Sequence, residues 1–211
     1  MPGIIRNTKE MSPRRRRNHE QMIASILEAA RGIMREDGVA ALSMQELARR
    51  MEMRAPSLYN YFTGKMDIYD ALFRLGFRLF SEHMAQATQA AQGWEEEIRL
   101  SMEAYMTFAL ESPELYQLCF ERPVPGFVPS EESLQASFGA LQQAYARVAK
   151  LYNSFEAGLP PEQTVDLVIA MMHGLTALHL ANEPHLPVGE GRFGSLIPVV
   201  VSILEKAWSK A

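Results

Sequence analysis

The sequence predicts an all-α fold of about nine helices, in which an N-terminal helix-turn-helix domain of three helices precedes a larger C-terminal helical domain. Apolar residues recur at helical spacing in most segments, and capping or helix-ending residues stand between these segments. Positive charge is concentrated in the first third of the chain. We expect a basic flexible arm at 1–17, the helix-turn-helix domain at 18–65 and the C-terminal domain at 66–211.

The composition excludes several classes of protein. The longest apolar run, from Leu196 to Leu204, contains Pro198 and Ser202 and is shorter than the roughly 20 residues of a membrane-spanning helix. No apolar segment follows the basic residues near the N-terminus, so we expect no secretory signal. The single cysteine, Cys119, makes no internal disulfide. We therefore expect a cytoplasmic protein without a membrane segment.

The charge is divided unequally along the chain. Residues 1–65 carry 12 Lys/Arg and 7 Asp/Glu, a net charge of +5, whereas the other residues carry 9 and 18, a net charge of −9, which together give the total of −4. A basic module suits a polyanion, because neutralised phosphates supply most of the non-specific affinity for DNA. The acidic remainder would repel DNA and is expected to have another role.

The arginine run Arg14 to Arg17 precedes the first predicted helix. Such a run is consistent with a solvated tail or with an arm that contacts DNA, and the sequence leaves both interpretations open. Apolar residues from Met22 to Ile33 recur at helical spacing and predict a helix from about Asn18 to Met34. Gly38 is expected to end the helix, because glycine accepts a left-handed conformation.

A short capped helix follows. Ser43 and Glu46 have the spacing of a capping box, which predicts the start of a helix, and Gln45 is exposed in its first turn. Residues 52–55 are predicted to form a turn. These features are typical of the first helix and the turn of a helix-turn-helix.

The segment from Pro56 to Phe62 is predicted to be the recognition helix. Proline suits the first turn of a helix, since its missing N–H would have no partner there. Leu58 and Phe62 lie four residues apart and share the inward face, so the side chains between them point elsewhere. Lys65 begins the next helix, where its ammonium group is placed to hold a phosphate.

The C-terminal domain is predicted to consist of helices alone. We expect helices that begin at Lys65, Trp94, Pro113 and Ser130, a loop at Arg122–Pro129, and two final helices. The helix after Ser130 carries an apolar stripe formed by Leu134, Phe138, Leu141, Tyr145, Val148 and Tyr152.

The last two helices are apolar around their whole circumference. A helix of this kind has to be covered on all sides, and one side is left for a partner after the core is filled. We therefore expect a homodimer that buries these helices in a two-fold four-helix interface. Gly174 would allow the partner helix to approach closely.

Residues 18–72 resemble the DNA-binding domain of the TetR/AcrR transcriptional regulators. The resemblance rests on the segment Ile26-Leu-Glu-Ala-Ala30, on Gly38, Ser43 and Leu47-Ala48, and on Leu58-Tyr-Asn-Tyr-Phe62 with Lys65. It implies DNA contacts from Gln45, Arg54, Ala55, Ser57, Tyr59 and Tyr61, with Lys65 on the phosphate backbone. The chain departs from the family pattern at Glu52, where the family has a turn glycine and where a positive φ costs energy in other residues.

The C-terminal part resembles a subset of this family known for a Trp-His-Gly signature. Residues 105–116 and 171–175 carry the resemblance, with Met172 in place of the tryptophan and His173-Gly174 retained. Aromatic and sulfur-containing side chains of this domain are candidates for lining a ligand pocket, although such residues more often form core. The candidates are Tyr105, Met106, Phe108, Tyr116, Phe138, Tyr145, Met172 and His173.

Metal and catalytic sites find little support in the sequence. His173, His179 and His185 are six residues apart, which is wrong for one helical face, and a hydrogen-bonded His173 is the simpler interpretation. No nucleophile elbow, carboxylate pair or glycine-rich phosphate loop is present, so we expect neither an enzyme nor a cofactor. Cys119 is interpreted as a small buried residue, with a thiol sensor as the alternative.

These patterns predict a DNA-binding transcriptional regulator. We expect a repressor that binds a palindromic operator on double-stranded DNA as a homodimer and is released by a small-molecule ligand. The alternatives are an architectural DNA-binding protein without an effector and a ligand-carrying or enzymatic helical protein that contains a helix-turn-helix.

Overall fold

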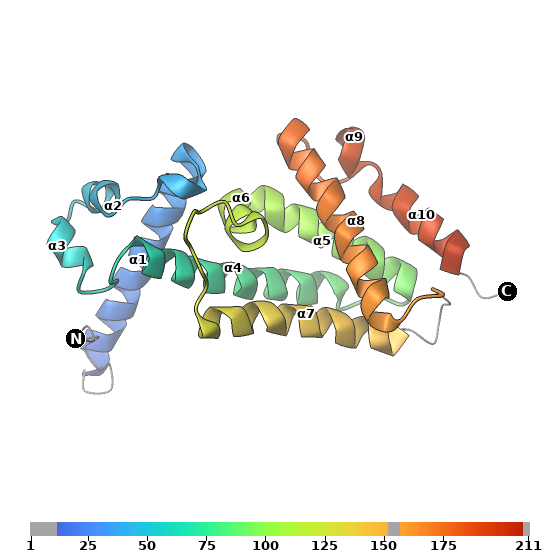
Figure 1. Ribbon diagram of the computed structural model, residues 1–211, viewed down its shortest axis with the longest axis horizontal. Coiled ribbons are helices and arrows are strands. Elements are labelled where there is room, and N and C mark those ends of the chain that lie inside the picture. Colours follow the sequence, from blue (N-terminus) through green and yellow to red (C-terminus); the bar gives the residue numbers. More distant parts are fainter. Residues whose placement is uncertain (1–11, 152–156, 209–211) are drawn as a thin grey trace. The chain divides into compact units, whose positions relative to one another are not determined.

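The computed structural model describes residues 12–151 and 157–208, and within these ranges the chain contains helices and no strands (Figure 1). The predicted all-α class is confirmed. The described residues form ten α-helical segments where about nine helices were expected, and three of these segments have only four residues. Their bounds are α1 Pro13–Asp37, α2 Met44–Arg50, α3 Ala55–Leu58, α4 Lys65–Thr88, α5 Trp94–Glu111, α6 Pro113–Tyr116, α7 Glu131–Leu151, α8 Pro161–Asn182, α9 Gly191–Gly194 and α10 Ile197–Trp208.

The chain forms two compact units that are not sequential. Unit 1 comprises the residues up to Gly76 together with Glu114–Ser133, and unit 2 comprises Phe77–Pro113 together with the residues from Leu134 onward. Helix α4 contributes to both units. The sequence predicted sequential domains instead, and the functional assignment of the ranges 18–65 and 66–211 stays a prediction.

Helix α1 begins at Pro13, five residues before the expected start, with proline in its first turn. The run Arg14 to Arg17 therefore belongs to α1, and the prediction that these residues lie in an arm is wrong. Residues 1–11 of the predicted arm lie outside the described ranges. The predicted inner stripe is confirmed, because Ile26, Ala30 and Ile33 are fully buried.

A buried carboxylate joins α1 to α6 within unit 1. Glu114 accepts hydrogen bonds from Arg31 Nε at 2.7 Å and from Arg35 Nε and Nη2 at 2.8 and 3.0 Å. The Glu114 side chain has no exposed surface. The hydrogen bond from Arg35 to Glu114 also raises the pKa of Arg35. Two guanidinium groups thus compensate one buried negative charge, which is the condition under which a buried carboxylate is tolerated.

The segment after α6 continues as a π-helical turn, Gln117–Glu121, and packs closely on α4. A Cβ atom placed on Gly76 would lie 2.5 Å from Cys119 Sγ, so only glycine allows this approach. Burial raises the pKa of the Cys119 thiol, which keeps the thiol protonated and weakly reactive. The structure supports the interpretation of Cys119 as a small buried residue over the thiol-sensor alternative.

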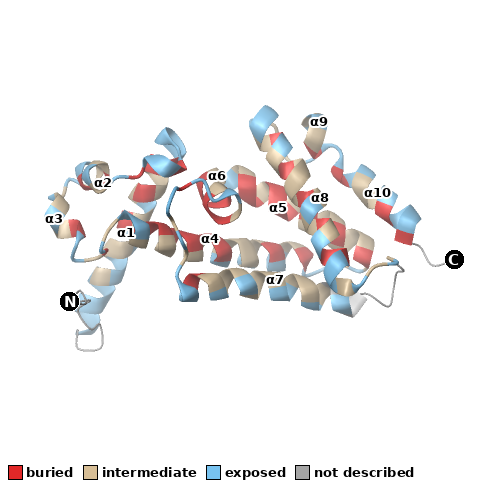
Figure 2. Ribbon diagram, viewed as in Figure 1, coloured by how far each residue is buried: buried red, intermediate tan, exposed pale blue. Residues whose placement is uncertain are grey.

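Unit 2 is built around α5, which packs against α8 and α10 and is buried along much of its length (Figure 2). The indole rings of Trp94 at the start of α5 and Trp208 at the end of α10 lie 5.6 Å apart. Further along, the Tyr105 hydroxyl lies 3.0 Å from His173 Nδ1 on α8. This contact agrees with the predicted hydrogen-bonded histidine, although His173 is only partly buried.

Helix α7 begins as predicted, with the Ser130 hydroxyl accepting a hydrogen bond from the Ser133 N–H at 3.2 Å. Its apolar stripe is open, however, and Phe138 is 57% exposed. Ser133 is the only buried residue among the described side chains of α7 (Figure 2). The Val148 side chain and Tyr152, which extend the predicted stripe, lie outside the described part of the chain.

Candidate nucleic-acid interface

Helix α2 is fixed by its own first turn. The Ser43 hydroxyl accepts a hydrogen bond from the Glu46 N–H at 3.2 Å, which is half of the predicted capping box. The Glu46 carboxylate does not return to Ser43 and instead accepts hydrogen bonds from Arg49 at 2.7 and 2.8 Å and from Arg50 at 2.9 Å. These bonds, first from Arg49 and then from Arg50, lower the pKa of Glu46 to about 2.

The turn after α2 closes through Glu52. The Met53 N–H donates to Ala48 O at 2.9 Å and the Glu52 N–H donates to Arg49 O at 3.2 Å. These two bonds form a Schellman motif, whose residue at the position of Glu52 adopts a left-handed conformation. Glu52 has φ of +52°. Glu52 therefore adopts the left-handed turn conformation that is expected of a glycine at this position.

The recognition segment is less regular than predicted. The prediction of a helix from Pro56 to Phe62 is wrong in its extent, because α3 ends at Leu58 and Pro56 is its second residue. The chain continues in tight turns, with the Asn60 N–H donating to Ser57 O and the Tyr61 N–H donating to Leu58 O at 3.3 and 2.9 Å. Leu58 and Phe62 are buried, as predicted from their spacing. Leu58 and Phe62 thus keep the inward face, although the backbone between them forms hydrogen bonds three residues apart instead of a regular α-helix.

The predicted DNA-contacting residues fall into two groups. Gln45, Arg54, Tyr59 and Lys65 are exposed, and within the described ranges none of them makes a side-chain hydrogen bond or ion pair. Ala55, Ser57 and Tyr61 are partly buried. Tyr59 is the most prominent aromatic of the segment, at 56% exposed. The first group is available to a ligand without breaking any internal contact.

The basic side chains near the recognition segment also form two groups, those paired with a carboxylate and those without one. Arg49 and Arg50 are held by Glu46, and Arg50 also lies 2.9 Å from Glu36. Arg54 and Lys65 flank α3, and neither has a carboxylate partner in the described ranges. Uncompensated positive charge is therefore placed at both ends of the recognition segment, where it attracts a polyanion.

His19 is a residue of this surface that the sequence reasoning missed. Its imidazole stacks on the Tyr61 ring, with centroids 5.0 Å apart and planes at 24°. No sequence pattern within a few residues of His19 or Tyr61 predicts a contact between α1 and the turn after α3. Tyr61, predicted to contact DNA, has one face of its ring occupied by this stack.

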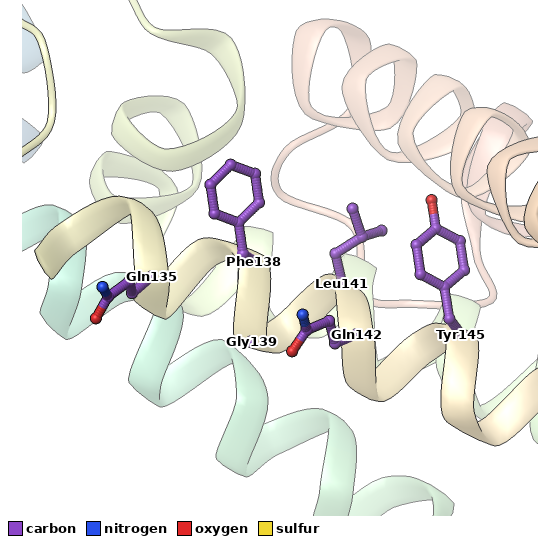
Figure 3. A pocket seen from close by; sticks show the side chains of 6 residues that line it. All are labelled: Gln135, Phe138, Gly139, Leu141, Gln142 and Tyr145. Carbon is purple, nitrogen blue, oxygen red and sulfur yellow. The ribbon is translucent and has the colours of Figure 1, made fainter. Parts of the chain in front are cut away.

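A pocket of about 510 Å³ opens beside α7 in unit 2 (Figure 3). Phe138, Leu141 and Tyr145 point upward in this view, and Gln135 and Gln142 lie lower along the same helix, so that all five line the pocket. The Tyr145 hydroxyl donates to Asp166 Oδ1 on α8 at 3.2 Å. The pocket thus combines an apolar stripe with amide groups and lies in the size range of small-molecule sites.

The eight predicted ligand-lining residues are not brought together. Phe138 and Tyr145 line the α7 pocket. Tyr116 is fully buried in unit 1, where its ring packs on Phe120 at 5.6 Å. The other five lie in unit 2, where Tyr105, Met106, Phe108 and Met172 are buried and His173 is partly buried. Among the described residues no group of three or more His, Cys, Asp or Glu could hold a metal ion.

Two family models match the sequence. The model of the bacterial regulatory proteins of the tetR family matches residues 26–72, and that of the tetracyclin repressor-like C-terminal domain matches residues 98–192. The chain belongs to the TetR family. The two matches together cover more than half of the sequence and include α2, α3, most of α5 and all of α6 to α8. The narrower resemblance to the Trp-His-Gly subset stays a prediction.

Similar proteins agree with this TetR membership. The uncharacterized HTH-type transcriptional regulator YobS of Bacillus subtilis (strain 168) is 33% identical over 92 residues, which are 44% of this chain and 48% of that protein. The chain spans about half the length of the curated relatives it matches.

Solved structures share the fold. A protein with unknown function from Rhodococcus sp. RHA1 has a TM-score of 0.75 at 18% identity, covering 89% of this chain and 95% of its own. The transcriptional regulator FadR from Bacillus subtilis in complex with stearoyl-CoA has a TM-score of 0.64 at 16% identity, covering 86% and 97%. At these identities the likeness establishes the all-helical fold alone.

Proposed function

We propose that the chain is a transcriptional repressor that binds a palindromic operator as a homodimer and is released by a small-molecule ligand. The observation that carries the proposal is the set of exposed side chains without internal partners on the helix-turn-helix, namely Gln45, Arg54, Tyr59 and Lys65. The capped α2, the closed turn at Glu52 and the buried Leu58 hold this set in place.

Each group has a role that follows from its chemistry. Gln45 is suited to hydrogen bonds with base edges, as glutamine pairs with adenine in the major groove. Lys65 is a cation at the start of α4 and is suited to a phosphate oxygen, which fixes orientation without reading sequence. Ala55, Ser57, Tyr59 and Tyr61 complete the proposed contact set. Two copies would read half-sites about 34–36 Å apart, one helical turn of DNA.

The proposed dimer uses the apolar surface that α8 and α10 leave uncovered. Leu178 on α8 is 47% exposed, and Val199 and Ile203 on α10 are 49% and 57% exposed. A Cβ atom on Gly174 would meet nothing within 4 Å, so α8 offers room for a closely packed partner helix. A second copy that covers these residues would remove their apolar side chains from water.

Helix α8 is also long and apolar enough to cross a membrane by length and composition, with a mean hydropathy of 1.4. Its buried side contains polar groups, including Thr164, Thr176 and His179, and His179 Nε2 lies 3.0 Å from Leu186 O. A helix packed against protein on this side and against a second copy on the other accounts for its composition. We therefore propose a cytoplasmic protein.

The proposed effector site is the α7 pocket in unit 2. Phe138, Leu141 and Tyr145 suit an apolar ligand, and the amides of Gln135 and Gln142 suit a hydrogen-bonding group on it. The proposed dimer has two conformations, one whose half-site spacing fits the operator and one whose spacing does not. A ligand that binds the second conformation more tightly lowers the affinity for DNA, by a factor set by the ratio of its affinities for the two conformations. The complex of FadR with stearoyl-CoA makes acyl-CoA a suitable first probe.

The DNA-binding step is tested with a duplex selected by the wild-type protein from a random pool. We expect a two-fold symmetric sequence, and we expect Tyr59→Ala and Lys65→Ala to weaken its binding in a fluorescence anisotropy titration. Arg99→Gln, which removes a charge that Glu103 already holds at 2.9 Å in unit 2, is the matched control and should bind as the wild type. Equal affinity for the selected and a random duplex would exclude a repressor and favour the architectural alternative.

The effector step is tested by thermal shift with a panel of small molecules that includes stearoyl-CoA. A compound that raises the Tm of the wild type should also release the selected duplex, and Phe138→Ala should reduce both effects. A compound that binds but leaves DNA affinity unchanged would support the ligand-carrier alternative instead. Chemical conversion of a bound compound would support an enzyme.

A further inference from the structure

We propose that the first two turns of α1 form a second DNA-contacting element, the α1 basic edge, in which Arg14, Arg15 and Arg17 contact DNA and His19 is a positioning residue. Its occupant is the phosphate backbone next to the bases that the recognition segment reads. The inference rests on the proposed DNA-binding function and assigns it a surface outside the helix-turn-helix.

The arginines of this edge are exposed and available. The side chains of Arg14, Arg15 and Arg17 make no hydrogen bond or ion pair within the described ranges. Arg16, in the same run, differs because its Nε lies 3.8 Å from Glu20 Oε1. Most arginines elsewhere in unit 1 are held by carboxylates, whereas these three share with Arg54 at the recognition segment the absence of a partner among the described residues.

The positive charges of the α1 basic edge lie at the helix end where they interact unfavourably with the helix dipole. No acidic residue stands in the first turn of α1, and the consecutive arginines follow Pro13 directly. Cations near the N-terminal end of a helix oppose its dipole and destabilise it. A bound polyanion would offset both this unfavourable arrangement and the mutual repulsion of the guanidinium groups.

The position of the edge connects it to the recognition segment. His19 stacks on Tyr61, three residues beyond the last residue of α3, and this contact fixes the side of α1 that faces the segment. Arg15 precedes His19 by four residues and therefore shares its face of the helix. Arg15 is thus the arginine of the run closest in direction to the DNA-facing surface.

The chemistry of the arginines fits phosphate. A guanidinium group presents a planar fork of donors that matches two phosphate oxygens, and the contact is independent of base sequence. His19 acts differently, as a positioning residue that holds the Tyr61 ring. Because the edge is helical, its charges have fixed spacing, in contrast to the flexible arm that the sequence predicted.

The experiment measures the salt dependence of DNA affinity for Arg15→Gln, with Arg16→Gln as the control of equal charge change. The duplexes are the one selected by the wild type and a random one, between about 50 and 200 mM salt. Loss of one phosphate contact should reduce the slope of log K against log salt by about 0.9, and weaken binding about eightfold at 0.1 M salt. Both duplexes should be affected by the same factor, because a phosphate contact carries no sequence information.

The control variants decide between an oriented edge and diffuse charge. Arg16→Gln should change the slope by clearly less than Arg15→Gln, and Arg15→Lys should recover most of the affinity. His19→Ala should lower the ratio of selected to random affinity, and His19→Phe, which keeps an aromatic ring for stacking, should restore it. Circular dichroism establishes that each variant is folded.

Two results would overturn the inference. Equal slopes for the wild type and Arg15→Gln on the selected duplex would show that the edge makes no phosphate contact, while leaving the proposed function intact. Equal losses for Arg15→Gln and Arg16→Gln would show that only net charge matters. If the wild type does not prefer the selected duplex, the proposed function itself fails. The affinities of the wild type for the two duplexes are enough to establish this, without any variant.

Discussion

At the scale of single residues, Glu52 combines a side chain and a backbone conformation that disfavour each other. Its φ of +52° places it in the left-handed region, where Cβ crowds the following carbonyl oxygen and costs about 1–2 kcal/mol. Arg122, also at φ +52°, ends the π-helical turn in the same conformation. Only Glu52 lies in the helix-turn-helix.

Glu52→Gly is expected to stabilise the protein by about 1 kcal/mol, because glycine adopts the left-handed conformation without the steric penalty. The measurement is the free energy of unfolding in urea. Glu52→Ala is the control, since it removes the same charge but keeps a Cβ atom. A gain of the same size for both variants would assign the effect to charge and contradict the backbone explanation.

Glu114 shows how one residue can hold two segments that are distant in the chain. Glu114→Gln should destabilise unit 1 by about 3 kcal/mol, because the amide leaves the facing Arg31 and Arg35 without their counter-charge. Urea unfolding measures the loss.

The control for Glu114→Gln is Glu132→Gln. Glu132 forms an ion pair with Arg74, and the Glu132 side chain is 78% exposed. This variant should change stability by less than about 0.5 kcal/mol. Similar losses for Glu114→Gln and Glu132→Gln would mean that burial of the carboxylate contributes nothing.

At the scale of elements, α2 is a helix of seven residues that depends on its own charges. Isolated helices of this length are not stable in water, so caps and side-chain pairs have a large relative effect. Ser43 at the N-terminal end, Glu46 in the first turn and the Schellman motif at the C-terminal end supply them. The orientation of Gln45 depends on these contacts.

The Glu46 contacts predict a pH dependence of stability. The pKa of Glu46 lies at about 2, below its ordinary value of 4.5, owing to the hydrogen bonds from Arg49 and Arg50. Since the folded-state pKa is lowered, the stabilisation is complete above about pH 4.5 and is lost as the pH falls towards 2. The difference in Tm between the wild type and Glu46→Gln should therefore shrink over this range.

Glu121→Gln, an exposed carboxylate outside α2, is the control for the Glu46 experiment. Carbon-detected NMR titration of the Glu46 carboxyl group provides a direct readout. A titration midpoint near 4.5 would show that Arg49 and Arg50 do not hold the carboxylate in solution.

At the scale of the whole molecule, the proposed dimer accounts for apolar surface that the single chain leaves exposed. Val199 and Ile203 lie four residues apart on α10 and share one face, opposite the buried Ile197 and Leu204. A partner that covers the exposed side would stabilise such a two-sided helix in water.

Ile203→Glu is expected to convert the dimer to a monomer, because it places a charge in the interface while the side chain is already exposed in the single chain. Analytical ultracentrifugation measures the mass. The two tryptophans of the chain, Trp94 and Trp208, pack on each other in unit 2, so unchanged tryptophan emission establishes that the variant is folded.

Val128→Glu is the matched control for the dimer, since Val128 is 79% exposed and lies outside α8 and α10. It should leave the mass unchanged. A wild type that is already monomeric at micromolar concentration, or an Ile203→Glu variant with the mass of the wild type, would contradict the proposed interface.

Much of the local structure could be predicted because it depends on residues a few positions apart. Ser43 and Ser130 mark the helix starts that they cap, and Gly38 marks the end of α1. The left-handed turn at Glu52 did not follow from its residue type, because glutamate disfavours that conformation, and only the family resemblance pointed to it. The extent of α3 did not follow, since helical spacing of Leu58 and Phe62 is compatible with a regular helix and with tight turns alike.

The sequence by itself determined the all-α class, the inner faces of α1 and of the recognition segment, the charge division and the exposed candidates Gln45, Tyr59 and Lys65. Only the tertiary structure decided the burial of Glu114 between two arginines, the stack of His19 on Tyr61 and the open stripe of α7. The physical reason is the range of the interactions. Capping and periodicity act within a turn or two of a helix, whereas the partner of a buried charge or an aromatic ring is chosen by packing between segments far apart in the chain.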